Sequence, residues 1–220
     1  MSDGLRVALT FDAEHPDRPH HGAHAGWVLD ELRRLDVRAS VFLQGRWVEA
    51  FPDLARRVAA DGHLVGHHSF YHARMPLLSG DGFAEDIREA ERVIIETTGT
   101  DPRPWARFPF GAGADRADLV DRLATLGYRH IGWDVEVYEW DPGRTADEIA
   151  GRAVEGVLAH GDGAILLLHT WPDPVAPALA EIVERLRAEH ARFVGVDELD
   201  LPDGLTPVGQ PQPPVAAPMG

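Results

Sequence analysis

Segments typical of β-strands and of α-helices alternate along this chain from one end to the other. The strand-like segments are short and apolar, and they cover residues 6–11, 39–43, 63–66, 105–108, 129–133, 164–169 and 192–196. Helical segments with apolar residues three or four apart lie between them, at residues 26–35, 52–61, 82–97, 115–126, 145–159 and 175–188. This alternation predicts parallel β-α-β units, because a parallel strand needs a crossover connection before the next one.

The number of these units favours a closed or nearly closed barrel over an open sheet. The Gly-x-Gly-x-x-Gly turn of an open dinucleotide-binding sheet is missing after the first strand. Residues 164–169 form a continuous apolar run, which is typical of a strand buried on both faces. We therefore predict an α/β fold in the form of a distorted, TIM-like (β/α) barrel.

The length of 220 residues predicts one domain with a tail. We place the domain at residues 1–201. Residues 202–220 are rich in proline and glycine, which predicts a disordered or surface-draped tail. The chain has no cysteine, and this excludes disulfides, thiolate zinc sites and cysteine nucleophiles.

Charge and hydropathy exclude two classes of partner. The net charge of −15 argues against a nucleic-acid partner. No apolar stretch approaches the ~20 residues that span a bilayer, so we expect no membrane insertion. Residues 1–4 lack the basic and apolar regions of a secretory signal. We therefore expect a cytoplasmic location, or secretion if a signal peptide was removed before Met1.

Acidic, histidine and arginine residues fall just past the predicted strands. They are Asp12, Glu14, His68, His72, Arg107, Glu136, Glu139 and His169. The carboxyl ends of parallel barrel strands open onto one face, where active sites are built, so these residues should meet in one pocket. Carboxylates, two histidines four apart, an arginine and a further histidine are the parts of a metal-assisted hydrolase.

The sharpest local signal is the pair His68 and His72. In a helical turn, residues four apart share a face, so both imidazoles could bind one ion. The alternative is a pair of solvated surface histidines, but Gly66 permits a tight exit from the preceding strand. Asp12 and Glu14 could ligate zinc or act as a general base, or they could be turn formers.

His169 ends the most apolar strand, where partial desolvation would place its pKa near the range useful for proton transfer. A core histidine bonded to a backbone carbonyl is the alternative. Glu136 and Glu139 would favour its charged form. Arg107 could fix a carboxylate by two hydrogen bonds, or it could form an ordinary surface ion pair.

Four further histidines crowd the first loop, at His15, His20, His21 and His24. They could form a second metal site, but we favour a polar loop at the rim of the pocket.

Taken in order, these residues resemble the five motifs of the NodB-homology polysaccharide deacetylases, carbohydrate esterase family 4. Residues 10–14, Thr-Phe-Asp-Ala-Glu, stand where the family has Thr-Phe-Asp-Asp-Gly. Residues 68–72 match His-Ser/Thr-x-x-His, residues 107–110 match Arg-x-Pro-aromatic, and residues 167–169 match Leu-x-His. Residues 136–140, Glu-Val-Tyr-Glu-Trp, stand where Asp-x-x-Asp-Trp is usual. The resemblance covers the chain from about Arg6 to Leu199.

The resemblance implies a distorted (β/α) barrel with seven or eight strands and a divalent metal, most commonly Zn²⁺. It also implies hydrolysis of an N-acetyl or O-acetyl group on a sugar or polysaccharide. Asp12 would be the general base and His169 the general acid. His68 and His72 would be metal ligands, Arg107 would hold Asp12 in place, and Glu139 would tune the pKa of His169. The Phe110 amide would help bind the oxyanion. Trp140 and Leu167 would form the pocket for the acetyl methyl group.

The chain departs from the family pattern at Ala13, where the family has a metal-ligating aspartate. Glu14 is the candidate replacement, because its extra methylene adds reach. His15 and Asp17 are weaker substitutes, and Asp12 could itself shift onto the metal. Together with the two glutamates of the fourth motif, these departures indicate a divergent member of the family.

Three functions are consistent with these residues. The first is a metal-dependent deacetylase acting on an acetylated carbohydrate, or on a small acetylated metabolite if Met1 is the native start. The second is a metal-independent amidohydrolase that cleaves C–N bonds on the same fold, motivated by Ala13. The third is a non-catalytic relative that binds a glycan or a protein.

Overall fold

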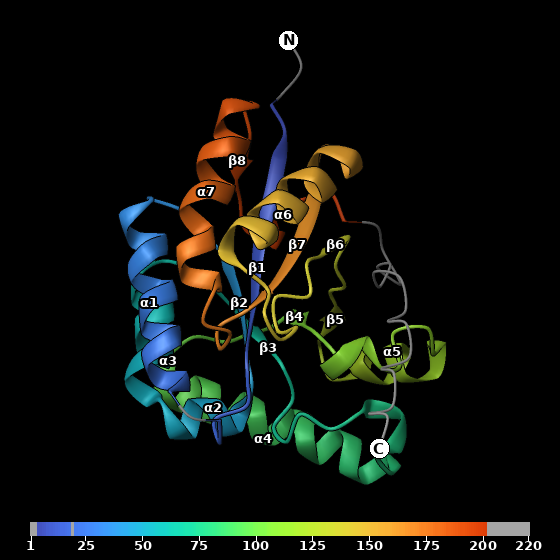
Figure 1. Ribbon diagram of the computed structural model, residues 1–220. Helices are drawn as coiled ribbons and strands as arrows, with labels where there is room; N and C mark the ends of the chain where they lie inside the picture. The colour runs from blue at the N-terminus through green and yellow to red at the C-terminus, as the bar shows by residue number, and fades with distance from the viewer. Residues whose placement is uncertain (1–3, 19, 202–220) are drawn as a thin grey trace, which may run out of the picture.

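The strands of the computed structural model form one parallel sheet that curls into an open barrel (Figure 1). The structure describes residues 4–18 and 20–201. Its strands are β1 (Arg6–Ala13), β2 (Ser40–Leu43), β3 (Leu64–His67), β4 (Trp105–Ala106), β5 (Arg129–His130), β6 (Val135–Glu136), β7 (Ala164–His169) and β8 (Arg192–Phe193). They are ordered β5-β4-β3-β2-β1-β7-β6, with β8 paired to β1. The predicted distorted (β/α) barrel is confirmed, and its seam lies between β5 and β6.

Helices cover the outside of the curled sheet (Figure 1). They are α1 (His21–Arg34), α2 (Gly45–Ala50), α3 (Pro52–Ala60), α4 (Gly80–Thr98), α5 (Ala117–Thr125), α6 (Ala146–His160) and α7 (Val175–Ala188). Helix α6 begins with the expected cap, since the Thr145 hydroxyl accepts a hydrogen bond from the Glu148 amide. Within the described residues, no helix is long and apolar enough to cross a membrane.

Three strands are markedly shorter than the sequence predicts, and one is additional. Strands β4, β5 and β8 contain two residues each, and β6 was not predicted at all. Two-residue strands show no alternation of apolar and polar side chains, so the sequence pattern cannot mark their ends. The predicted tail, residues 202–220, lies outside the described residues.

Alternating side chains of β1 and β7 serve two separate cores. Leu9 of β1 and Leu166 of β7 belong to the large cluster between the sheet and the helices. Their neighbours Ala8 and Ile165 belong to a smaller cluster inside the barrel. All six residues of β7 are buried, as expected for a strand covered on both faces. By the same alternation, Asp12 of β1 and His169 of β7 turn their side chains toward the barrel axis at its carboxyl end.

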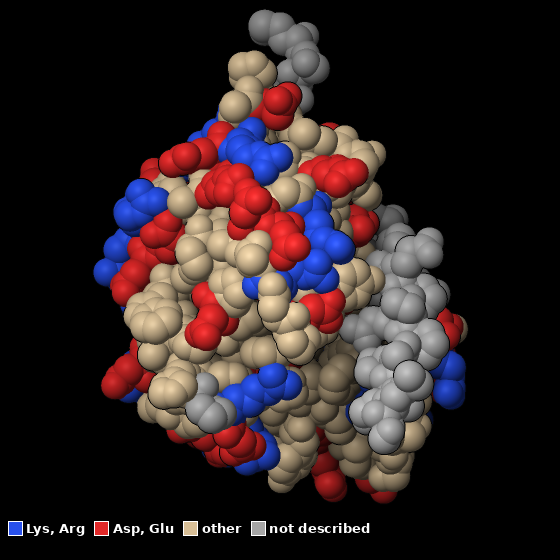
Figure 2. Space-filling view, in the orientation of Figure 1, with Lys and Arg blue, Asp and Glu red and all other residues tan. Residues whose placement is uncertain are grey.

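Basic and acidic side chains are interspersed over the face shown in Figure 2. On this face neither sign of charge gathers into a large continuous field. Such a mixed surface gives no stripe along which a nucleic-acid backbone would be favoured.

We predict that Gly66→Ala destabilises the fold. A Cβ at Gly66 of β3 would lie 2.5 Å from the Phe42 ring, which is fully buried inside the barrel. The ring cannot move away, so the free energy of unfolding should fall by about 1–3 kcal/mol. Urea unfolding measures this loss.

Gly151→Ala on α6 is the matched control. A Cβ there meets nothing within 4 Å, so the better helix propensity of alanine should leave stability unchanged or raise it by up to ~1 kcal/mol. Equal unfolding midpoints for Gly66→Ala and the unmodified protein would contradict this description of the barrel interior.

Candidate active site

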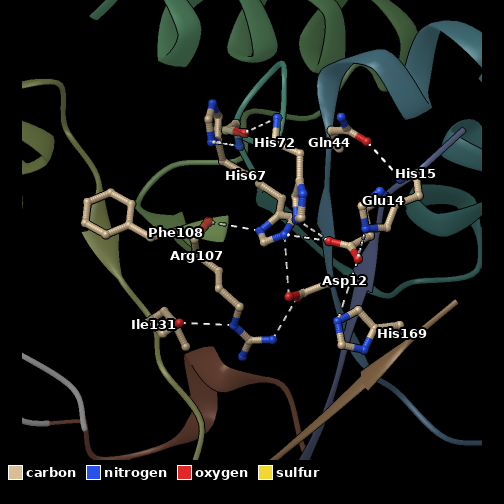
Figure 3. A network of polar contacts seen from close by, with 12 residues as sticks. Asp12, Glu14, His15, Gln44, His67, His72, Arg107, Phe108, Ile131 and His169 are labelled. Carbon is tan, nitrogen blue, oxygen red and sulfur yellow. Dashed lines mark hydrogen bonds and ion pairs between the residues drawn. The ribbon is translucent and has the colours of Figure 1, made fainter. Parts of the chain in front are cut away.

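The structure brings the predicted polar residues together at the carboxyl end of the barrel (Figure 3). Asp12 and His169 are register partners on the neighbouring strands β1 and β7. Glu14 follows β1 directly, and His68 follows β3. Asp12 Oδ2 and Glu14 Oε2 lie 3.5 Å and 3.2 Å from His68 Nε2. Residues from distant parts of the chain therefore form one buried cluster.

Arg107 is buried beneath this cluster and is bonded to Asp12. Its Nη1 donates to Asp12 Oδ1 at 2.9 Å, while Nε and Nη2 donate to the carbonyls of Ile131 and Gly132. The guanidinium also lies over the Phe42 ring, at 4.2 Å from its centre. A buried cation needs such a full set of partners. Because Oδ1 is occupied, Asp12 presents its other oxygen, Oδ2, to the site.

Residues 68–72 do not form the helical turn that the sequence predicts. Ser69 and His72 have φ angles of 61° and 59°, in the left-handed region. The Ser69 Oγ accepts a hydrogen bond from the His72 amide at 2.9 Å. The prediction of a shared helix face is therefore wrong, although the two imidazoles do meet, with ring centres 5.0 Å apart.

Two buried residues that sequence reasoning missed hold this turn. The Asp86 carboxylate, on α4, accepts hydrogen bonds from the amides of Phe70 and Tyr71, each at 3.0 Å. His67 donates from Nε2 to the Ile87 carbonyl and accepts the Ser69 amide at Nδ1. Burial lowers the pKa of His67 to about 4, so the ring is neutral and can play both parts. An acidic residue within the apolar stripe of the 82–97 helix was the available signal for Asp86.

Glu14 uses its two oxygens for different partners. Oε2 faces His68 and His72, and it contacts Nε2 of both rings. Oε1 lies 3.0 Å from His15 Nε2 and accepts the Trp171 indole N–H at 3.2 Å. Burial opposes ionisation of Glu14, but the surrounding imidazoles outweigh it and hold the pKa of this carboxyl well below its usual range. Glu14 is thus an anion clamped on one side and free to bind a cation on the other.

The donor set of Glu14, His68 and His72 fits a divalent metal ion. Their ligand atoms all lie within 4.8 Å of one another. His68 Nδ1 lies 3.0 Å from the Arg107 carbonyl and donates to it, which leaves the lone pair of Nε2 directed at Glu14. Two acceptors face each other there, an arrangement that a cation satisfies. Two imidazoles, one of them anchored to a backbone carbonyl, and a carboxylate are typical zinc ligands.

Ala13 contributes nothing to this set. Its methyl group is fully buried in the cluster between the sheet and the helices. Glu14, one residue further on, supplies the only acidic ligand atoms in the Glu14–His68–His72 group.

His169 lies beside Asp12 and Glu14 and is bonded to Glu139. Its Nδ1 donates to Glu139 Oε1 at 2.7 Å, and its backbone amide donates to the same oxygen at 2.6 Å. Burial alone would lower the pKa of His169, but the Glu139 charge and hydrogen bond, with smaller contributions from Glu14 and Asp12, raise it to about 9. Nε2 of the protonated ring is directed toward Glu14, at 3.8 Å from Oε1. His169 can therefore donate a proton inside the site at neutral pH.

Comparisons with known proteins agree with this geometry. The sequence profile of the family described as Polysaccharide deacetylase matches residues 2–131, which is more than half of the chain. The chain belongs to the polysaccharide deacetylase family. The profile match includes the first three motifs, and the structure brings the fourth and fifth motifs into the same site.

Relatives of this polysaccharide deacetylase family member include proteins with assigned activities. The chain is 35% identical over 175 residues to the chitooligosaccharide deacetylase of Rhizobium leguminosarum bv. trifolii, covering 79% of this chain and 75% of that protein. It is 31% identical over 194 residues to the peptidoglycan-N-acetylglucosamine deacetylase PgdA of Listeria monocytogenes. That match covers 88% of this chain but only 38% of the Listeria protein.

One similar solved structure is a variant of BA3943, described as a CE4 family pseudoenzyme with restored enzymatic activity. It superposes with a TM-score of 0.79 at 26% identity, over 90% of this chain and 68% of that chain. The barrel of this family member is therefore shared with a protein described as a pseudoenzyme.

The three residues predicted at the substrate surround the cluster. The Phe110 ring is half-exposed and lies 4.5 Å from the His72 ring, measured between centres. The Trp140 ring meets the His169 ring edge-on at 4.9 Å. Leu167 is buried inside the barrel, two residues before His169 on β7. Their roles toward substrate stay predictions.

The histidine-rich segment that follows β1 packs around Trp171, which sequence reasoning missed, and two of its histidines, His21 and His24, lie on α1 rather than in a loop. The His21 ring stacks on the indole at 5.8 Å, and His24 Nδ1 lies 2.8 Å from the Trp171 carbonyl. The described residues contain two groups of three metal-ligand candidates, Glu14–His68–His72 and Asp12–Glu14–His169, and neither includes a histidine of this segment. The expected polar rim is thus built from the start of α1 as well as from the loop, and the loop reaches the cluster through His15.

We predict that Glu139→Gln lowers the pKa of His169. The raised value, about 9, depends on the negative charge of Glu139 against the cost of burial. Without that charge the ring should lose its proton at or below about 6.5, the ordinary value. Histidine NMR signals followed against pH measure the change, with the His169 signal assigned by its loss in His169→Gln.

Glu136→Gln is the control, because Glu136 is a half-buried neighbouring acid with no hydrogen bond to His169 among the described contacts. A smaller shift is expected there. Equal shifts in both variants would mean that Glu139 has no special hold on the ring.

Proposed function

We propose that this chain is a metal-dependent hydrolase that removes an acetyl group from an N-acetylated sugar of an oligosaccharide or polysaccharide. One observation carries the proposal: the Glu14–His68–His72 ligand set lies next to both a buried carboxylate, Asp12, and a protonated imidazole, His169. These are the groups that hydrolysis of an amide requires. The activities of the chitooligosaccharide and peptidoglycan deacetylases among its relatives support the same chemistry.

The chain's own residues would take separate roles in the reaction: metal binding, proton acceptance and proton donation. A divalent metal held by Glu14, His68 and His72 would supply Lewis acidity to the acetyl carbonyl and the attacking water. Asp12 Oδ2, left free by Arg107, would accept the proton of that water as its oxygen bonds to the carbonyl carbon. His169 Nε2 would then donate a proton to the departing nitrogen as the C–N bond breaks. The products are acetate and a free amine on the sugar.

A non-catalytic function is the second candidate, and the likeness to the BA3943 pseudoenzyme favours it. Against it stands the connected network of Asp12, Arg107, His68, Glu139 and His169. A binding protein has no need of a buried base and a buried acid next to a metal-ligand set. We therefore propose catalysis.

We expect Glu14→Ala to abolish tight zinc binding. The unmodified chain, stripped with a chelator and reloaded, should bind one equivalent of zinc. Loss of one of three protein ligands should weaken the affinity by more than the ~10–100-fold typical of an outer-shell change. Competition with a chromophoric chelator measures the dissociation constant.

His20→Ala is the matched control, because His20 is exposed and outside both ligand groups. Unchanged affinity in Glu14→Ala would remove Glu14 from the metal site. Full turnover by a rigorously chelated enzyme would instead favour the metal-independent amidohydrolase.

The variant Asp12→Asn tests whether Asp12 acts as the general base or as a metal ligand. The amide cannot accept the proton of water, so kcat on an acetylated chitooligosaccharide should fall ~10²–10⁴-fold. Zinc affinity should change little, because Asp12 is not among the three proposed ligands. Acetate release in a coupled assay measures kcat, and loss of zinc together with activity would show that Asp12 is a ligand instead.

A further inference from the structure

A cleft opens beside His169, between the loops that follow β1, β6 and β7. Its lining includes Arg18, His21, His24, Trp140, Arg144 and Trp171. Trp140 and Trp171 form the walls nearest the site, with ring centres 4.9 Å and 6.0 Å from that of His169. A sugar whose nitrogen received a proton from His169 would extend its substituents, or the next sugar, over this cleft.

Within the cleft each acidic side chain pairs with a basic one, and the Arg18 guanidinium is a further positive charge. Each acidic side chain has a basic partner: Asp141 with Arg144 at 2.7 Å, Asp173 with His24 at 2.6 Å, and Glu139 with His169 at 2.7 Å. Arg18 has no carboxylate partner among the described residues, and its one recorded contact there is with the Trp171 ring. In a chain of net charge −15, the cleft beside the proposed acid thus carries an uncompensated guanidinium.

Arg18 is held in a position suited to a carboxylate. Its guanidinium carbon lies 3.9 Å above the centre of the Trp171 ring. Trp171 is itself held by the hydrogen bond to Glu14 and by the stacked His21 ring. A guanidinium stacked on an aromatic face keeps its N–H groups in a plane, where they can donate two parallel hydrogen bonds to a carboxylate.

The distance from Arg18 to His169, the proposed general acid, fits a substrate that carries a carboxylate. The legs of 3.9 Å and 6.0 Å through the Trp171 ring centre place the Arg18 guanidinium within about 10 Å of the His169 ring. A carboxylate on the acetylated sugar, or on its neighbour, lies within that reach.

We propose that this cleft binds the carboxylate of an acidic N-acetylated saccharide, with Arg18 as the residue that selects it. The carboxylate could belong to a lactyl ether or to a hexuronic acid, since both present the same two oxygens. This inference rests on the proposed function, because it places the acetyl group of that saccharide beside His169. It names the substrate class as acidic glycans rather than neutral ones.

A pair of disaccharides tests the proposal. N-acetylglucosaminyl-N-acetylmuramic acid and di-N-acetylchitobiose differ chiefly by one lactyl carboxylate. Isothermal titration of the full chain should give about tenfold tighter binding of the acidic disaccharide, as expected for a partly exposed, charge-assisted pair of hydrogen bonds. Arg18→Ala should abolish this preference and leave the affinity for the neutral disaccharide unchanged.

Arg88→Ala is the matched control, because Arg88 is an exposed arginine on α4 with no ion pair recorded among the described residues. It removes the same charge and should keep the preference. A third probe, an acetylated disaccharide with a hexuronic acid, distinguishes the two carboxylate sources, and selectivity for either one supports the proposal.

Equal affinity for the acidic and neutral probes, a preference that survives Arg18→Ala, or binding of neither probe would overturn the inference. Turnover separates its failure from that of the proposed function. Arg18-dependent binding without acetate release would reject the proposed deacetylase activity and support the acidic-glycan site. Acetate release from the acidic and the neutral disaccharide at equal kcat/KM, unchanged by Arg18→Ala, would keep the deacetylase and reject the carboxylate site.

Discussion

The buried ion pair between Arg107 and Asp12 is the interaction on which the rest of this site depends. Arg107 joins the end of β1 to the carbonyls of Ile131 and Gly132, just before the open seam of the barrel (Figure 3). Its own carbonyl accepts the His68 Nδ1–H and so orients a metal ligand. A buried guanidinium without these partners would cost several kcal/mol. One residue therefore orients the proposed base through its side chain and one ligand through its carbonyl, and it ties two strand ends together.

The parts of the fold that follow from local pattern could be predicted, and those that depend on distant contacts could not. Residues 164–169 and 175–188 are a strand and a helix with the predicted ends, because a long apolar run and a clear helical period mark them. The sequence of residues 68–72 predicts a helical turn, but a carboxylate on α4 accepts hydrogen bonds from two amides of this segment and holds it in a non-helical conformation. Asp86 lies too far along the chain for any local pattern to show that contact.

The candidate site shows the same division. The order of the motifs and the missing ligand at Ala13 can be read from the sequence, and Glu14 follows as the nearest carboxylate with extra reach. What the sequence cannot show is that Trp171, from the loop after β7, holds one oxygen of Glu14 and leaves the other for the imidazoles. That division depends on a contact across 157 positions of the chain. Arg18 lies in a polar loop whose sequence gives no sign of a binding role. Its proposed role depends on its contact with the same indole.

Trp171 therefore belongs to two sites at once. Its N–H bonds a carboxylate oxygen of Glu14, while its ring supports Arg18 in the neighbouring cleft. Any guest that shifts the ring also changes how firmly Glu14 is held, and any ion that tightens Glu14 also steadies the platform beneath Arg18. Thermodynamic linkage makes this influence reciprocal: the factor by which a bound saccharide alters metal affinity equals the factor by which the metal alters saccharide affinity. The shared indole makes cooperativity between two different ligands a property of a single side chain.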